Sequence, residues 1–128
     1  MRVLLDTHVF LWWNEGNSQL SKKAQRIMGD PANTLVLSVA SAWEIAIKVQ
    51  LRKLRLPEDT ASYVQNRAAR DYMEILAIRL EHAAALQSLP MLHRDPFDRM
   101  LVVQSQIEKL SILTADQDIR NYAVDSIW

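Results

Sequence analysis

Short apolar runs alternate with longer helix-like segments along the whole chain, and this alternation constrains the fold more than any other feature. The runs have the length and the branched side chains of buried strands. They are Val3–Leu5, Leu35–Leu37, Ile75–Ile78, Ser111–Leu113 and, as a weaker signal, the stretch from Val124 onward. Strands that alternate with helices form a mainly parallel sheet covered on both faces. We therefore expect an α/β fold with about five strands.

The segments between the runs carry helix-forming residues with apolar side chains three and four positions apart. Helices are predicted over Ser21–Met28, Ser41 to about Leu54, Thr60–Arg70, Glu81–Leu89 and Pro96 to about Lys109, with another near Val9. Only 2 glycines and 4 prolines occur, so no flexible linker or repeat divides the chain. Its 128 residues, 49% of them hydrophobic, suit one domain over residues 1–128 with a buried core.

The composition excludes several kinds of site. The absence of cysteine removes disulfides, thiolate metal sites and cysteine nucleophiles, and it suits a reducing compartment. The 15 Lys and Arg residues balance the 15 Asp and Glu residues, so binding of nucleic acid would need a local basic patch. No apolar run approaches the roughly 20 residues of a membrane span, and a charge comes too early for a secretory signal. We expect a cytoplasmic protein without a membrane contact.

Acidic residues follow several of the predicted strands. In open α/β sheets the functional site lies beyond the carboxyl ends of the strands. Asp6 directly follows the first run, and Asp116 follows the fourth run after a Thr-Ala step. Glu44 lies one turn into the helix after the second run, and Asp98 lies one turn into a later helix. We expect these acids to gather at one edge of the sheet.

Each acid also has a local structural explanation. Asp6 can cap the helix that follows it, and Asp95 suits the N-cap of a helix whose first position is Pro96. Ser41-x-x-Glu44 has the spacing of a capping box, which is the interpretation favoured by these residues alone. A carboxylate among apolar neighbours would nevertheless be costly to desolvate without a cation or hydrogen bonds. The histidine at position 8 has no metal-spaced partner and is interpreted as a packing or hydrogen-bonding residue.

The acids are more informative as a group than singly. Four carboxylates at one edge of a sheet repel one another unless a cation lies among them. Oxygen ligands without cysteine or paired histidines select a hard ion such as Mg²⁺ or Mn²⁺. An ion of this kind activates water and stabilises displacement at phosphorus, so hydrolysis of a phosphodiester is the favoured chemistry. The candidates are Asp6, Glu44, Asp98 and one of Asp116 and Asp118, the other being a cap, with the Thr114 hydroxyl orienting a carboxylate or a water.

The chain carries five motifs in order: LLDTHVFLWW, SVASAWEIAIKVQLRKL, HRDPFDRMLVVQSQ, ILTADQDIRNYAV and the terminal IW. This ordered set resembles the PIN-domain ribonucleases, in particular the VapC-like toxins of type II toxin–antitoxin modules, over nearly the whole chain. The resemblance implies a PIN-like α/β/α sandwich with a central, mainly parallel sheet. It also implies an Mg²⁺- or Mn²⁺-dependent endoribonuclease that cuts structured RNA, forms a homodimer and is silenced by a cognate antitoxin.

The acidic positions of that family fall on Asp6, Glu44, Asp98 and Asp116, and its polar position before the fourth acid falls on Thr114. We assign Asp98 rather than Asp95 because an apolar helix follows Asp98 directly. Asp118 remains an alternative to Asp116. The alternative function is a catalytically inactive PIN-fold module that binds RNA or a protein, although none of the four acidic positions departs from the family pattern.

RNA that approaches a negative pocket needs positive groups around it. The candidates are Lys48, Lys53, Arg55, Arg94 and Arg99, of which Lys48 can also pair with Glu44 four residues earlier. We expect Arg94 and Arg99 to remain free for solvent or phosphate. Trp12 and Trp13 are interpreted as core and interface residues, and their exposed part is the expected region of antitoxin or dimer contact.

Overall fold

A computed structural model describes residues 1–128 and contains one sheet of five strands. All neighbouring strands are parallel. In sheet order the strands are β3 (Glu74–Leu76), β2 (Thr34–Ser38), β1 (Arg2–Leu5), β4 (Ser111–Leu113) and β5 (Ser126–Ile127). The predicted α/β fold with about five strands is confirmed.

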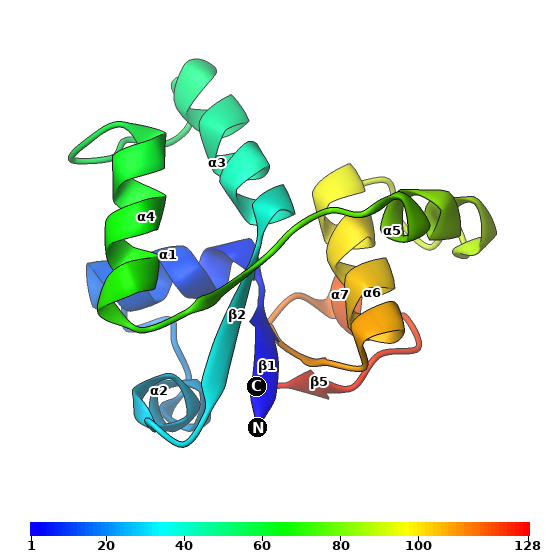
Figure 1. Ribbon diagram of the computed structural model, residues 1–128, viewed down its shortest axis with the longest axis horizontal. Helices are drawn as coiled ribbons and strands as arrows, with labels where there is room; N and C mark the ends of the chain where they lie inside the picture. The colour runs from blue at the N-terminus through cyan, green and yellow to red at the C-terminus, as the bar shows by residue number, and fades with distance from the viewer.

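Helices cover both faces of this sheet (Figure 1). On one side lie α1 (Thr7–Glu15), α2 (Lys22–Gly29) and α4 (Thr60–Arg70), and α3 (Val39–Gln50) extends beyond the carboxyl end of β2. On the other side lie α5 (Leu80–Ala85), the 3₁₀ turn η1 (Leu86–Ser88), α6 (Pro96–Glu108) and α7 (Gln117–Arg120). None of these helices has both the length and the apolar character needed to cross a membrane.

The alternation of side chains along β1 builds two hydrophobic layers. Val3 and Leu5 are fully buried in one cluster, which also contains Phe10 from α1. Leu4 is fully buried in the other cluster, together with Leu101 from α6. Successive side chains of a strand point to opposite faces, so a continuous apolar run is required where both faces are covered. This is why the short runs were recognisable as central strands.

Several element boundaries differ from the prediction. The helix α3 begins at Val39, two residues early, because the Ser38 hydroxyl accepts a 3.0 Å hydrogen bond from the Ala40 N–H and so caps it. It ends at Gln50 rather than near Leu54, because Arg52, two residues later, has a positive φ of 58° that is incompatible with a continuing helix. The third strand is Glu74–Leu76 rather than residues 75–78, and the predicted helix over residues 81–89 divides into α5 and η1.

The strand order places a topological switch between β1 and β4. The chain runs from β1 outward to β2 and β3, then returns to the opposite side of β1 with β4 and β5. Helices that leave β1 and β4 therefore diverge to opposite faces of the sheet, and in open α/β sheets ligands bind beyond the carboxyl ends of the strands at such a point. Asp6 and Thr114 are the first residues after them.

Candidate active site

The register of β1 against β4 brings Asp6 and Thr114 together. Leu5 is paired with Leu113, so the next residue of each strand lies at the same level. The Thr114 hydroxyl donates a 2.8 Å hydrogen bond to Oδ2 of Asp6, and the Asp6 N–H donates to the Leu113 carbonyl at 3.1 Å. Both Asp6 and Thr114 are buried. The carboxylate is therefore held in one orientation at the switch point.

Asp6 is also a helix cap, as its position after β1 predicted. It is the N-cap of α1, and its Oδ1 accepts a long hydrogen bond of 3.4 Å from the His8 N–H. Burial raises the pKa of the Asp6 carboxyl, while the hydrogen bond from Thr114 opposes this shift. Capping and a place in the acidic group are thus compatible for this residue. His8 is exposed, and its ring lies 5.7 Å from that of Trp12, which agrees with the packing role predicted for it.

Thr114 connects Asp6 to Asp116. Its hydroxyl oxygen accepts a 2.9 Å hydrogen bond from the Asp116 N–H while donating its proton to Asp6. Asp116 is the N-cap of α7 and accepts a 2.9 Å hydrogen bond from the Asp118 N–H. Asp118 itself is exposed. After the larger effect of burial, repulsion by Asp116 also raises the pKa of Asp6, so the charge of Asp116 lies close by. The geometry favours Asp116 over Asp118 as the acid of this group.

Glu44 is buried, with 3% of its surface exposed, on the second turn of α3. Its Oε2 forms a 2.7 Å ion pair with Lys48, as the spacing of four residues predicted. Its Oε1 is buried and has no hydrogen-bond partner at all. A carboxylate oxygen in this state is costly to bury, so it marks a position where a further positive group would be stabilising.

The predicted capping box of Ser41 and Glu44 is wrong. Ser38 occupies the N-cap, which places Ser41 within the helix. The Ser41 hydroxyl instead accepts a 2.9 Å hydrogen bond from the Thr7 hydroxyl at the start of α1. The box failed because local spacing cannot distinguish two serines that both precede an apolar helix. Glu44 is consequently released from a capping role and points its second oxygen elsewhere.

The two aspartates at the start of α6 have different roles. Asp95 is the N-cap, and its Oδ1 accepts hydrogen bonds from the N–H groups of Phe97 and Asp98 at 2.9 and 3.0 Å, as predicted. Asp98 is 8% exposed. Its pKa is raised to about 8, first by burial and then by the charges of its acidic neighbours, which are Asp95, Asp6, Asp116 and Glu44. The charges of the other three predicted acids therefore all act on Asp98.

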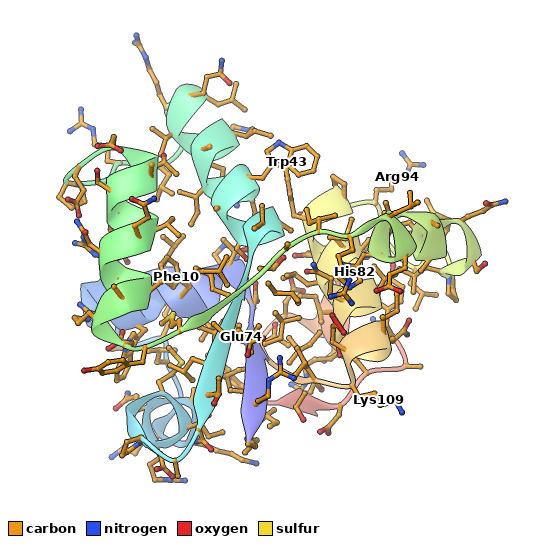
Figure 2. All side chains as sticks on the ribbon, in the orientation of Figure 1. Phe10, Trp43, Glu74, His82, Arg94 and Lys109 are labelled. Atoms are coloured by element: carbon orange, nitrogen blue, oxygen red, sulfur yellow. The ribbon has the colours of Figure 1, made fainter.

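The prediction that Arg99 is a free positive group around the acidic site is wrong. Arg99 is 7% exposed rather than free, and its guanidinium donates to the Pro90 and Leu89 carbonyls at 2.8 and 3.3 Å and to the Tyr122 hydroxyl at 3.0 Å. On the first turn of a helix with a buried face, an arginine adjacent to Asp98 is drawn inward by these carbonyl acceptors. Arg94 does extend outward near the start of α6 (Figure 2).

The other positive residues predicted to contact RNA lie around α3. Lys48 is paired with Glu44, and both Lys53 and Arg55 are exposed beyond the end of the helix. Trp12 and Trp13 are half-buried against the first hydrophobic cluster, as expected of core residues. The more exposed tryptophan is Trp43, which projects from α3 toward α6 (Figure 2) and meets Phe97 edge to face at 5.0 Å.

Sequence reasoning missed His93, which contacts this group, and Tyr122, which contacts His93. His93 Nε2 lies 3.2 Å from Oδ2 of Asp98, and His93 Nδ1 lies 2.9 Å from the Tyr122 hydroxyl. His93 precedes α6 in a loop and Tyr122 follows α7, so neither shares a periodic pattern with the acids. The HRDPFD segment offered one signal, because its histidine lies five positions before Asp98.

The donor chemistry of this acidic group suits a hard divalent cation. Its members are carboxylates and one hydroxyl, and burial together with the charges of neighbouring acids raises the pKa values of Asp6 and Asp98. The buried Oε1 of Glu44 lacks any partner. No three Asp, Glu or His side chains stand close enough together to enclose an ion as they lie here. The fit therefore rests on the oxygen donors and on the unpartnered oxygen of Glu44.

The sequence profile of the PIN domain family matches residues 3–125, which is nearly the whole chain. The chain belongs to the PIN domain family. The predicted resemblance is confirmed.

Two relatives from Mycobacterium tuberculosis are ribonucleases by name. Ribonuclease VapC22 is 26% identical over 121 residues, covering 94% of this chain and 91% of that protein. Ribonuclease VapC16 is 44% identical over 62 residues, which span only 48% of this chain and 44% of that protein.

The PIN fold is also found in a solved structure, that of VapBC2 from Rickettsia felis bound to a DNA fragment from their promoter. Its matching chain has a TM-score of 0.73 at 14% sequence identity, and the alignment covers 100% of this PIN domain and 99% of that chain. At this level of identity the similarity concerns the fold. The predicted α/β/α sandwich of the PIN type is thereby confirmed.

Proposed function

We propose that this PIN domain is a metal-dependent endoribonuclease, the toxin component of a type II toxin–antitoxin pair. The observation that carries the proposal is that burial and the charges of Asp6, Asp116 and Glu44, with that of Asp95, raise the pKa of Asp98 to about 8, while Glu44 keeps an unpartnered buried oxygen. Burying carboxylates close to one another costs free energy, so such a group is expected where a cation offsets the charge. The names of VapC16 and VapC22 support a ribonuclease.

Asp6, Glu44, Asp98 and Asp116 would hold Mg²⁺ or Mn²⁺. When bound, the ion would supply charge neutralisation and activation of a water for attack on a phosphodiester. Thr114 keeps Asp6 in one orientation, and Asp95 fixes the first turn of α6 from which Asp98 projects. Lys48 neutralises one oxygen of Glu44 and leaves the other for the site. The exposed cations Arg94, Lys53 and Arg55 would contact RNA phosphates.

The test is to incubate the purified protein with total RNA, with and without Mg²⁺ or Mn²⁺, beside Asp98→Asn. Cleavage that needs the ion and disappears in Asp98→Asn, with the fold intact by circular dichroism, is the expected result. Asp116→Asn and Asp118→Asn form a matched pair, and only the former should abolish cleavage. Metal-independent cleavage or an equally active Asp98→Asn would contradict the mechanism, and RNA binding without cleavage would favour the inactive binding module.

The proposed partners follow from the resemblance to VapC-like toxins: a cognate antitoxin and a second copy of the chain. Apolar surface beside the site suits a protein contact, since Trp43 is 54% and Val39 is 40% exposed on α3. Light scattering of the purified chain measures the dimer, and Trp43→Ala should weaken whichever contact covers this helix. A monomer at micromolar concentration would contradict the homodimer.

A further inference from the structure

His93 lies between Asp98, an acid of the site, and the Tyr122 hydroxyl. Its Nε2 lies 3.2 Å from Oδ2 of Asp98, and its Nδ1 lies 2.9 Å from the Tyr122 hydroxyl. The side chains of His93 and Asp98 are only 12% and 11% exposed. Water therefore has little access to this contact, and the direction of each hydrogen bond has to be set by the protein groups themselves.

The direction of these bonds follows from counting donors at the Tyr122 hydroxyl. Its oxygen lies 3.0 Å from Nη1 of Arg99 and 3.3 Å from the backbone N–H of His93, and both of these groups can only donate. They use the two lone pairs of the phenol oxygen. The hydroxyl proton must then be donated to an acceptor, and Nδ1 of His93 is the partner in reach.

Arg99 fixes this arrangement because its charge is permanent and its position is buried. The guanidinium also donates to the Pro90 carbonyl at 2.8 Å and to the Leu89 carbonyl at 3.3 Å. These carbonyls can only accept, so the arginine cannot turn away from Tyr122 without losing partners. The order of donation therefore runs from Arg99 to Tyr122 and from Tyr122 to His93.

We infer that His93 is a positioning residue for Asp98, with Nδ1 held as a hydrogen-bond acceptor and Nε2 as the donor. With Nδ1 serving as acceptor, Nε2 must bear the proton, and it donates to Oδ2 of Asp98. This fixes one oxygen of the carboxylate and leaves Oδ1 for a cation. The inference rests on the proposed function, because it concerns how Asp98 is presented to that cation. Donors to ligating carboxylates commonly contribute about 10- to 100-fold in metal affinity.

The tautomer can be measured directly in the metal-free protein. The chain has 3 histidines, so ¹⁵N-resolved NMR of the imidazole rings is tractable, and the His93 signals are assigned by their disappearance in His93→Gln. The expected signature is a protonated Nε2 and an unprotonated Nδ1. In Tyr122→Phe, which keeps the ring but removes the hydroxyl donor, the resonance of Nδ1 should shift because its hydrogen bond is lost. A protonated Nδ1 in the wild type, or an unchanged Nδ1 resonance in Tyr122→Phe, would overturn the inference.

The positioning role is measured by titrating Mg²⁺ into the full chain by calorimetry, with His93→Leu and His93→Gln as a matched pair. Leucine fills similar space but cannot donate, whereas the glutamine amide offers an N–H near the position of Nε2. We expect affinity to fall about tenfold or more in His93→Leu and to be largely restored in His93→Gln. Thermal unfolding of both variants measures any loss of packing that they share.

The outcomes separate this inference from the proposed function. Wild-type affinity in His93→Leu, or an equal loss in both variants, overturns the role of His93 while leaving the nuclease proposal intact. A wild-type chain that binds neither Mg²⁺ nor Mn²⁺ contradicts the metal-dependent function itself, and with it the positioning role.

Discussion

Thr114 and Asp6 lie 108 positions apart in the sequence, yet a buried 2.8 Å hydrogen bond joins the Thr114 hydroxyl to Oδ2 of Asp6. The same hydroxyl accepts from the Asp116 N–H. One side chain thus orients an acid after β1 and anchors the turn that carries an acid after β4. The pair explains how two adjacent parallel strands contribute to a single site.

Thr114→Val should lower both stability and RNA cleavage. Valine keeps the shape of threonine but removes the donor to Asp6 and the acceptor for Asp116, at a cost of about 1–3 kcal/mol in the free energy of unfolding. Denaturant unfolding and a cleavage assay measure the two effects. Thr114→Ser is the control and should retain most of both, since its hydroxyl can make the same bonds. Full cleavage by Thr114→Val would show that Asp6 needs no such support.

Asp98→Asn should abolish cleavage while stabilising the metal-free fold at neutral pH. Because the pKa of Asp98 is raised from 3.8 to about 8, the folded state retains a proton that the unfolded chain loses above about pH 4. The wild type therefore loses stability as the pH rises from about 4 to about 8. The variant lacks this dependence and should gain on the order of 1–3 kcal/mol at pH 7.

Thermal unfolding of both proteins in EDTA, from about pH 4 to about pH 8, tests this sign. The two curves should converge at the acid end of the range and separate as the pH rises. A variant that is less stable than the wild type at neutral pH would mean that burial of the Asp98 charge and repulsion by its acidic neighbours do not dominate at this position.

Lys48→Met should destabilise the metal-free protein more than the metal-loaded one. Lys48 is the partner of the buried Glu44 carboxylate at 2.7 Å, and methionine preserves the aliphatic contacts without the charge. The Lys48 side chain is 35% exposed, so the loss is modest, about 1–2 kcal/mol in EDTA. Millimolar Mg²⁺ should recover much of that loss if it reaches Glu44. Equal destabilisation with and without Mg²⁺ would separate Glu44 from the cation site.

Arg99 and Arg94 should behave differently despite their proximity in the sequence. Arg99→Lys breaks the fork of hydrogen bonds to the Leu89 and Pro90 carbonyls and to Tyr122, and should cost about 3 kcal/mol in the free energy of unfolding. Arg94→Ala should leave stability within about 0.5 kcal/mol of the wild type.

Arg94→Ala should instead weaken RNA binding. If Arg94 neutralises one phosphate, its removal should make the slope of log affinity against log salt concentration shallower by about 0.7. An unfolding curve and a salt-dependent binding assay distinguish the two arginines. A stable Arg99→Lys would contradict the structural role of Arg99, and an unchanged salt slope in Arg94→Ala would remove Arg94 from the RNA-binding rim.

The fold was accessible from the sequence because its strongest constraint is local. A central strand covered on both faces needs an uninterrupted apolar run, as in Val3–Leu5, and helices that cover a sheet need apolar side chains at helical spacing. Asp95, Pro96 and the cap at Asp6 were predictable for the same reason, since capping involves residues only two or three positions apart. The edge strand β3 was less well defined, because Ile75 is 50% exposed and the buried pattern is lost there.

The site was predictable only as a list of acids. The sequence by itself determined that Asp6, Glu44, Asp98 and Asp116 follow strands or begin helices of an α/β sheet. Only the tertiary structure decided that Thr114 bonds to Asp6, that Ser41 faces Thr7 rather than Glu44, that Arg99 turns inward and that His93 contacts Asp98. The physical reason is that each of these contacts joins segments brought together by strand register and helix packing, whose energies depend on the whole core and leave no mark in the local spacing of residues.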